Sequence, residues 1–264
     1  MQQLGKRKKN WKYILLGIII ILSGCAKHNK DDKKHNELGS GNKSNLPVSL
    51  DLLIEHAEYC KAIYDGGGDQ KDEVAFEVKQ KDGISIIVIR GTANKSNIES
   101  DIDIRLVEDA RTGIKLHKGF RDAAVTVMQI IDTSTTTRNT VQGQTLTYPL
   151  EQTVYVTGHS LGGAVAQIIG MWLHKRGKNV QVFSYGSPKV SSEVLSGGQP
   201  THWRVVRRSD PIPFTPPWPY EHTGLFIDSQ DLDWGVDNDN GLISETDGLD
   251  HAIAKYVETL KAQK

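Results

Sequence analysis

The chain has 264 residues, with 32 basic and 32 acidic side chains and therefore a formal net charge of zero. This length is sufficient for one large domain, or two small ones, with a proper hydrophobic core. The charge balance excludes a strongly basic nucleic-acid-binding protein and an acidic disordered chain. The two cysteines exclude a disulfide scaffold and a cysteine-based zinc site.

The balanced charge hides an uneven distribution along the chain. Residues 1–45 hold ten basic and three acidic side chains, so the remainder carries an excess of seven negative charges. A basic cluster at 6–9 precedes an apolar run at 13–22 and small residues, which is the layout of a secretory signal. The run is shorter than the roughly 20 residues that span a bilayer. An uncleaved membrane anchor remains the alternative.

The end of this run, Leu22-Ser23-Gly24-Cys25, resembles the lipobox of bacterial lipoproteins. The resemblance implies a signal peptide over 1–24, lipidation of Cys25 after cleavage, and export to a membrane of the bacterial cell envelope. Two or more acyl chains, at about 0.8 kcal/mol per buried methylene, give stable anchoring. Residues 25–45 are too polar to form a core and are expected to be a flexible tether. The mature chain would be acidic, with 27 basic and 32 acidic side chains.

From residue 46 onward, apolar periodicity and turn residues predict alternating strands and helices. Ser49 stands at the N-cap of the first helix, and Cys60 within that helix is expected to be a core thiol. The alternation predicts one α/β domain over 46–264, a mostly parallel central sheet with helices on both faces. The expected helices are 50–64, 119–131, 161–174 and 251–261, the expected strands are 73–79, 84–89, 153–157, 179–185, 203–208 and 225–228, and 133–151 is expected to be a loop or an irregular hairpin.

A G-x-S-x-G pattern at 158–162 lies between the predicted strand 153–157 and the predicted helix 161–174. A strand, a sharp turn and a helix are what a nucleophile elbow requires, because its serine sits on strained backbone between closely packed neighbours. Ser160 is therefore the candidate nucleophile. Its hydroxyl needs a base and an acid to activate it.

In α/β-hydrolases the acid and the base follow the serine in the order Asp or Glu, then His. Asp210 follows the strand 203–208, at the sheet edge where open α/β sheets place functional groups. Two histidines come later, His222 and His251. His251 is favoured because it follows the last strand and starts the last helix, and His222 is the alternative. The acidic stretch 228–239 is expected to be a solvated loop, since Gly241 is out of register for an EF-hand.

Together these residues resemble the class 3 lipases, the fungal-lipase-like branch of the α/β-hydrolases. The resemblance runs from about residue 50 to 256 and implies Ser160 as nucleophile, Asp210 as acid and His251 as base. It also implies backbone N–H groups of Thr92 and Leu161 as the oxyanion hole. The family's His-x-x-Tyr spacing is wider here, at His251 and Tyr256. The matching motifs are R-G-T at 90–92, L-H-K-G-F at 116–120, V-T-G-H-S-L-G-G at 156–163, Y-G-S-P-K-V at 185–190 and D-P-I-P with P-P at 210–217.

The resemblance implies a serine hydrolase that cleaves lipid or small carboxylic esters, acylglycerols among them, through an acyl-enzyme and without a metal or cofactor. Residues 93–103 are polar where a lid that meets lipid is usually apolar, which favours an esterase-like preference. A feruloyl-type or other short-chain esterase is the alternative within enzymes, and a non-catalytic surface-binding lipoprotein is the alternative outside them. His117 is expected to order the backbone near the site, and His159 to point away from the Ser160 side chain. The oligomeric state stays open.

Overall fold

The computed structural model describes residues 40–66, 69–71, 74–91, 103–136, 139–141, 144–146, 149–193, 199–235 and 249–264. Cys25, Thr92 and the end of the acidic stretch, residues 236–239, lie outside this part of the chain, as do the predicted signal peptide and most of the predicted tether. Among the described helices, none is long and apolar enough to cross a membrane.

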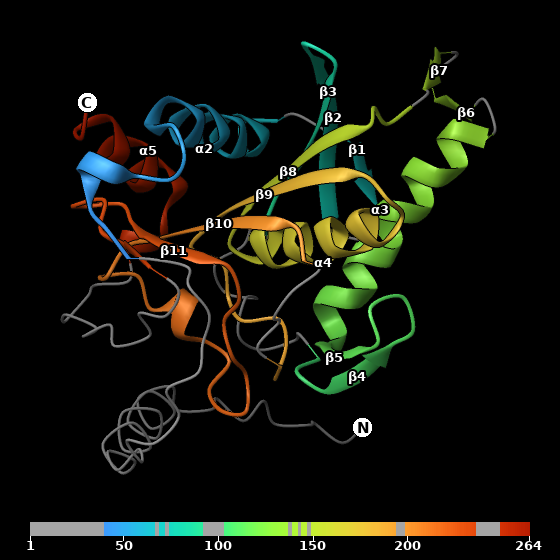
Figure 1. The fold of residues 1–264 in the computed structure, drawn as a ribbon. Helices are drawn as coiled ribbons and strands as arrows, with labels where there is room; N and C mark the ends of the chain where they lie inside the picture. The colour runs from blue at the N-terminus through green and yellow to red at the C-terminus, as the bar shows by residue number, and fades with distance from the viewer. Residues whose placement is uncertain are drawn as a thin grey trace, which may run out of the picture. The chain divides into compact units, whose positions relative to one another are not determined.

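A central eight-stranded sheet organises the fold (Figure 1). Five of its strands run parallel, and antiparallel strands complete both edges. This confirms the predicted mostly parallel α/β sheet. In spatial order the strands are β1 (Asp69–Lys71), β2 (Val74–Lys81), β3 (Ile84–Ile89), β8 (Thr153–His159), β9 (Asn179–Tyr185), β10 (Thr201–Val206), β11 (Leu225–Asp228) and β12 (Trp234–Gly235).

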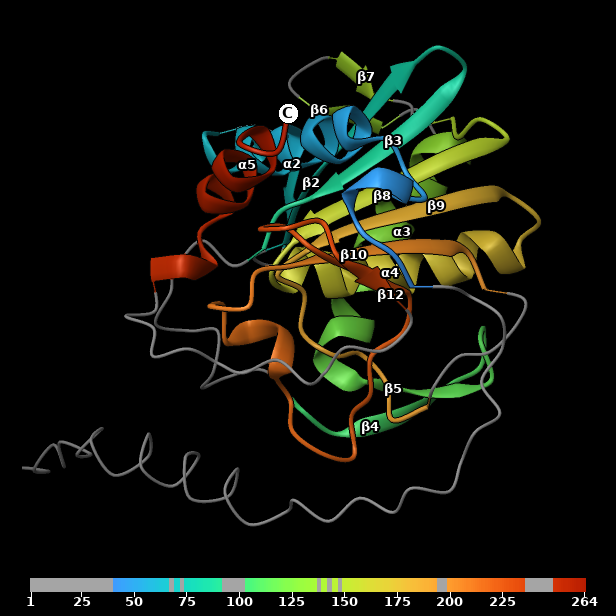
Figure 2. The ribbon, with the colours of Figure 1, turned by 60° about the vertical axis from the view of Figure 1, so that its left-hand side comes forward.

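Helices cover both faces of the sheet, as Figures 1 and 2 show. On one face lie α2 (Leu50–Tyr64) and α5 (Ile253–Lys261), which contact each other. On the other face lie α3 (Lys118–Thr136) and α4 (Leu161–Lys175). Because both faces are covered, the central strands are apolar on both sides, which explains β-branched runs such as the one in β3.

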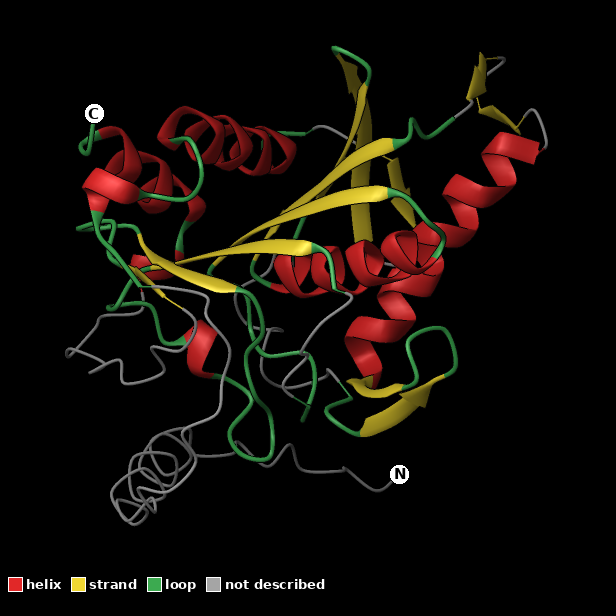
Figure 3. Cartoon of the chain, in the orientation of Figure 1, coloured by secondary structure: helices red, strands yellow, loops and turns green. Residues whose placement is uncertain are grey.

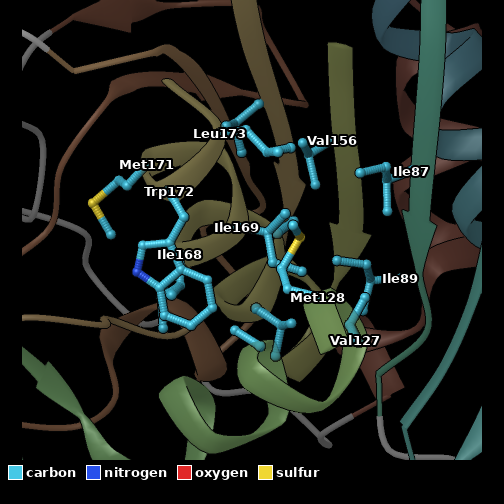
Figure 4. Close-up of a cluster of buried hydrophobic side chains, with 14 of the residues drawn as sticks. Ile87, Ile89, Val127, Met128, Val156, Ile168, Ile169, Met171, Trp172 and Leu173 are labelled. Atoms are coloured by element: carbon cyan, nitrogen blue, oxygen red, sulfur yellow. The ribbon is translucent and has the colours of Figure 1, made fainter. Parts of the chain in front are cut away.

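Two large apolar clusters and a small third one, which contains Ile63, Ile86 and Val88, fill the space between these layers. The cluster under α3 and α4 includes Met128, Val156 and Trp172 (Figure 4), and the cluster under α2 and α5 includes Leu53 and Tyr256. Successive residues of one strand serve opposite clusters, since side chains alternate along a strand. Cys60 is fully buried in the second cluster, as predicted for a core thiol.

The connections between these elements contain two short hairpins, the first of which the sequence patterns did not predict (Figure 3). β4 (Leu106–Asp109) and β5 (Ile114–His117) form a separate hairpin. The polar stretch after residue 133 contains the end of α3 and a second hairpin, β6 (Asn139–Val141) with β7 (Gln144–Leu146), in line with the predicted loop or irregular hairpin.

Within residues 40–45, predicted as the end of the tether, Gly41 pairs with the edge of the sheet. Gly41 exchanges two backbone hydrogen bonds with Trp234, each 3.0 Å long, and the 3-10 helix η1 (Lys43–Asn45) follows with an Asn42 cap. The folded part therefore includes residues before the predicted start at 46. Ser49 does occupy the N-cap of α2, but its hydroxyl makes no capping hydrogen bond.

Candidate active site

Ser160 occupies the sharp turn between β8 and α4. Its backbone has φ of 60° and ψ of −133°, a strained conformation that costs a non-glycine residue about 1–3 kcal/mol. The flanking glycines permit the turn because neighbouring backbone atoms lie so close to them that a side chain would not fit. A Cβ on Gly158 would lie 2.2 Å from the Gly162 oxygen, and one on Gly162 would lie 2.3 Å from the Ile89 oxygen. The predicted strand, turn and helix around Ser160 are thus confirmed.

The structure brings Ser160, Asp210 and His251 together. The His251 Nε2 lies 2.8 Å from the Ser160 Oγ, and the His251 Nδ1 lies 2.7 Å from the Asp210 Oδ2. Since a carboxylate only accepts, Nδ1 carries the proton and Nε2 is left to accept from the serine hydroxyl. The Asp210 side chain is fully buried, whereas that of His251 is 14% exposed. This arrangement can remove a proton from Ser160 and stabilise the imidazolium that results.

The alternative base, His222, has a different environment. Its Nε2 donates to the backbone oxygen of Pro213 at 2.5 Å, and burial lowers its pKa well below the usual value for histidine. Of the two candidates, His251 is therefore the one that the structure places against Ser160.

Both oxygens of the buried Asp210 carboxylate accept hydrogen bonds. Its Oδ2 accepts from His251 and, at 2.6 Å, from the Tyr256 hydroxyl, and its Oδ1 accepts from the Ile212 N–H at 2.9 Å. Burial, and then the Asp210 carboxylate, raise the pKa of Tyr256 well above its usual value, so the phenol remains a donor. Such pairing offsets the large cost of burying an isolated charge.

Tyr256 reaches Asp210 despite the wide spacing from His251. The histidine ends the 3-10 helix η4 (Leu249–His251), Ala252 intervenes, and Tyr256 lies in the first turn of α5. The spacing between His251 and Tyr256 is wider because the chain passes from η4 into α5 between them. Both side chains consequently meet the same carboxylate.

Of the two expected oxyanion-hole donors, Leu161 lies within the described residues. The N–H of Leu161 belongs to the first turn of α4, where backbone donors have no acceptor within the helix, and it directly follows Ser160. Gly91, the residue before Thr92, packs against the elbow, since a Cβ there would lie 2.6 Å from the His159 oxygen and 3.0 Å from the Ser160 Cβ. Thr92 itself lies outside the described residues, so its role stays a prediction.

The two other histidines of the motifs are buried. His117 stacks on Phe120 with ring centroids 3.8 Å apart, and burial lowers its pKa to about 4. Its backbone N–H donates to the Val190 oxygen, so it ties β5 to the segment after β9. The His159 ring lies 4.6 Å from the His251 ring and bonds to the His251 backbone, a contact that the sequence pattern did not predict. Within the described part of the chain, no group of three or more acidic, histidine or cysteine side chains could hold a metal ion.

Comparison with known proteins gives a consistent picture. Residues 86–220 match the family model described as lipase (class 3). The chain is 31% identical over 219 residues to secreted mono- and diacylglycerol lipase 1 of Fusarium solani, covering 69% of this chain and 64% of that protein. It is 29% identical over 191 residues to a lipase of Rhizomucor miehei, covering 66% and 49%. The chain thus spans about half to two thirds of the length of these curated relatives.

Solved structures share the fold. The triacylglyceride lipase of Rhizomucor miehei superposes with a TM-score of 0.60 at 23% identity, covering 81% of this chain and 95% of that one. Lipase II from Rhizopus niveus superposes with a TM-score of 0.59 at 22% identity, covering 80% and 94%. At this identity the likeness establishes the fold, which is the predicted α/β-hydrolase fold.

Proposed function

The chain belongs to the class 3 lipase family, and from this premise we propose that it is a serine hydrolase that cleaves carboxylic esters of acylglycerol-type lipids. The observation that carries the proposal is the single histidine, His251, that contacts both Ser160 and Asp210. This arrangement also argues against the non-catalytic alternative, because a binding protein has no need of a strained serine aligned with a buried acid and a base.

In the proposed reaction Ser160 Oγ attacks the ester carbonyl while His251 Nε2 takes its proton. Asp210 keeps His251 in the required tautomer and stabilises the imidazolium. The Leu161 N–H, with the Thr92 N–H as its expected partner, donates a hydrogen bond to the former carbonyl oxygen and so stabilises its negative charge. Collapse of the tetrahedral intermediate breaks the ester C–O bond, and His251 returns its proton to the leaving alcohol oxygen. Water, deprotonated by the same histidine, then hydrolyses the acyl-enzyme and releases the acid.

Acylglycerols are supported as substrates by the relatives, one named a mono- and diacylglycerol lipase and another a triacylglyceride lipase. The second candidate is a short-chain or feruloyl-type esterase, which is favoured by the polar sequence at 93–103. Rates on p-nitrophenyl esters from acetate to palmitate separate the two. A maximum at long chains supports the lipase, and a maximum at short chains, with turnover of methyl ferulate, supports the alternative.

The proposal is tested by Ser160→Ala in the same ester series. We expect kcat to fall by about 10⁴-fold or more, as when a triad member is removed from other serine hydrolases. Ser85→Ala is the matched control. Ser85 is also fully buried, but it lies near the N-terminal end of β3, whereas Ser160 follows the C-terminal end of the neighbouring strand β8. Activity of Ser160→Ala within tenfold of wild type would contradict the assignment of the nucleophile.

We further propose that the chain is exported and lipid-anchored through Cys25, with residues 1–24 as signal peptide, the residues from 25 up to the pairing of Gly41 as tether, and the hydrolase domain after it. The support is the sequence pattern around Cys25 and the name of the Fusarium relative, which is secreted. Cys25→Ser should abolish incorporation of labelled palmitate and leave the protein in the soluble or precursor fraction. Cys60→Ser is the control, because Cys60 is buried in the core. Unchanged membrane extraction of Cys25→Ser would favour an uncleaved anchor.

A further inference from the structure

The His159 side chain links two elements that are distant in sequence. Its Nε2 lies 2.7 Å from the backbone oxygen of His251, and its Nδ1 lies 3.0 Å from the hydroxyl of Tyr64. A carbonyl oxygen only accepts, so Nε2 must carry the ring proton and Nδ1 must accept. Tyr64 is then the donor. The hydrogen bonds run in one direction, from Tyr64 through the ring to the backbone of His251.

The electrostatics agree with a neutral ring. Burial, and then the neighbouring His251, lower the pKa of His159 well below its usual value. Burial raises the pKa of Tyr64 well above its usual value, so its hydroxyl keeps its proton. A neutral His159 matters because its ring centroid is only 4.6 Å from that of His251, which becomes a cation during the proposed reaction.

The link holds a residue whose own backbone lies in short local structure. His251 ends a single turn of 3-10 helix and precedes the N-cap of α5, so no strand fixes it. Two adjacent residues at the end of β8 contact it instead. Ser160 contacts the ring, and His159 contacts the backbone oxygen. The nucleophile and the support of the base are therefore neighbours in the chain.

We propose that His159 is a positioning residue that holds the backbone of His251 in register with Ser160, and that Tyr64 selects the tautomer of His159 that can do so. The inference rests on the proposed hydrolase function, and it deepens that function by assigning two further residues to the site. Displacement of a catalytic group by about 1 Å can cost about 100-fold in rate. Loss of the positioning role of His159 should therefore lower kcat.

Three variants test the proposal in the full chain. His159→Phe keeps a buried ring and removes both hydrogen bonds, and we expect kcat to fall about 10- to 100-fold with KM changed less than about threefold. His159→Gln keeps an N–H donor near the position of Nε2 and should recover most of the loss. Tyr64→Phe removes one hydroxyl and should give a smaller fall. Rates are normalised to active sites that are titrated with a fluorophosphonate, so loss of folded protein does not count.

The matched control is His56→Phe. His56 is also fully buried, and it stacks on Phe183 with centroids 4.0 Å apart, but it has no hydrogen-bond partner within the described residues. This variant should leave kcat per active site at the wild-type value.

Each outcome decides the question. Wild-type kcat per site in His159→Phe, an equal fall in His159→Gln, or the same fall in His56→Phe overturns the positioning role. If His159→Phe does not fold, Tyr64→Phe decides, and an unchanged kcat there overturns the tautomer assignment. An inactive wild-type protein would instead contradict the proposed function, so the two failures are distinguishable.

Discussion

Tyr256 and His251 share one oxygen of Asp210, with the phenol 2.6 Å and the imidazole nitrogen 2.7 Å from the Oδ2 atom. Tyr256→Phe removes one of the three donors around a fully buried carboxylate. A hydrogen bond to a charged group contributes about 1.5–3 kcal/mol, so we expect the free energy of unfolding to fall by about this amount. We also expect kcat/KM to fall about tenfold. Urea titration and ester kinetics measure the two effects, and no change in either would show that the bond is dispensable.

Asp210→Asn should leave the fold intact and lower kcat by about 10⁴-fold, because an amide group at this position can bond to the wrong tautomer of His251. Asp132→Asn is the control. Asp132 forms an ion pair with Arg176 at 2.8 Å, and both side chains are more than two fifths exposed. Surface pairs of this kind contribute at most about 1 kcal/mol to stability. Since Asp132 does not contact the proposed catalytic residues, the kcat of Asp132→Asn should be unchanged. A loss below tenfold in Asp210→Asn would remove Asp210 from the proposed mechanism.

Gly162→Ala should prevent folding or severely lower the melting temperature. The added Cβ would lie 2.3 Å from the Ile89 oxygen and 2.8 Å from the Arg90 carbonyl carbon, and backbone in a central strand cannot move aside. Gly113→Ala is a contrasting variant, since it has φ of 77° and nothing within 4 Å of the added atom. Only backbone strain applies there, at about 1–2 kcal/mol. Equal melting temperatures for the two variants would contradict the close packing at the elbow.

Acid should destabilise the fold through buried neutral histidines. Burial lowers the pKa of His56 and of His202 to about 3 from the usual 6.5. Below pH 6.5 the unfolded chain takes up a proton at each site and the folded chain does not until about pH 3, so stability falls as the pH falls through this window. The slope is about 1.4 kcal/mol per pH unit for each histidine, or about 2 kcal/mol each between pH 6.5 and 5.

Urea titrations at pH 7, 6 and 5 measure this effect, and His56→Phe provides the control. Removing one such histidine should reduce the pH dependence of the unfolding free energy by about one proton over this range. An identical slope in wild type and variant would show that His56 is not buried as a neutral ring.

The sequence could predict the central strands and the positions of the triad because both carry strong local signals. The run at 84–89 is β-branched and fills a strand that is buried on both faces. Ser160 lies in a motif whose glycines have steric reasons to be there. Asp210 and His251 follow in the order that this topology requires. Local pattern and chain order predicted Ser160 and Asp210, and they favoured His251 over His222, which the structure then places apart from Ser160.

The remainder of the site depends on contacts that no local pattern records. Tyr64 and His159 are 95 positions apart, and neither has a neighbour that signals the bond between them. The expectation for His159 was only that it points away from the Ser160 side chain. The sequence around the turn does not show that the backbone of His251, 92 positions later, lies beside its ring. The hairpin of β4 and β5 was also missed, and its two strands form a sheet of their own apart from the central sheet.

The pairing of Gly41 with Trp234 has a mechanical consequence. A pull applied to the chain before residue 40 reaches the domain at the edge strand β12 and not at the strands β8 and β10, which precede Ser160 and Asp210. The two hydrogen bonds between Gly41 and Trp234 would take the load first. The stretch from 41 to the start of α2 could then extend to at most about 30 Å, at about 3.5 Å per residue. The load would next reach α2, before the strands that precede Ser160 and Asp210.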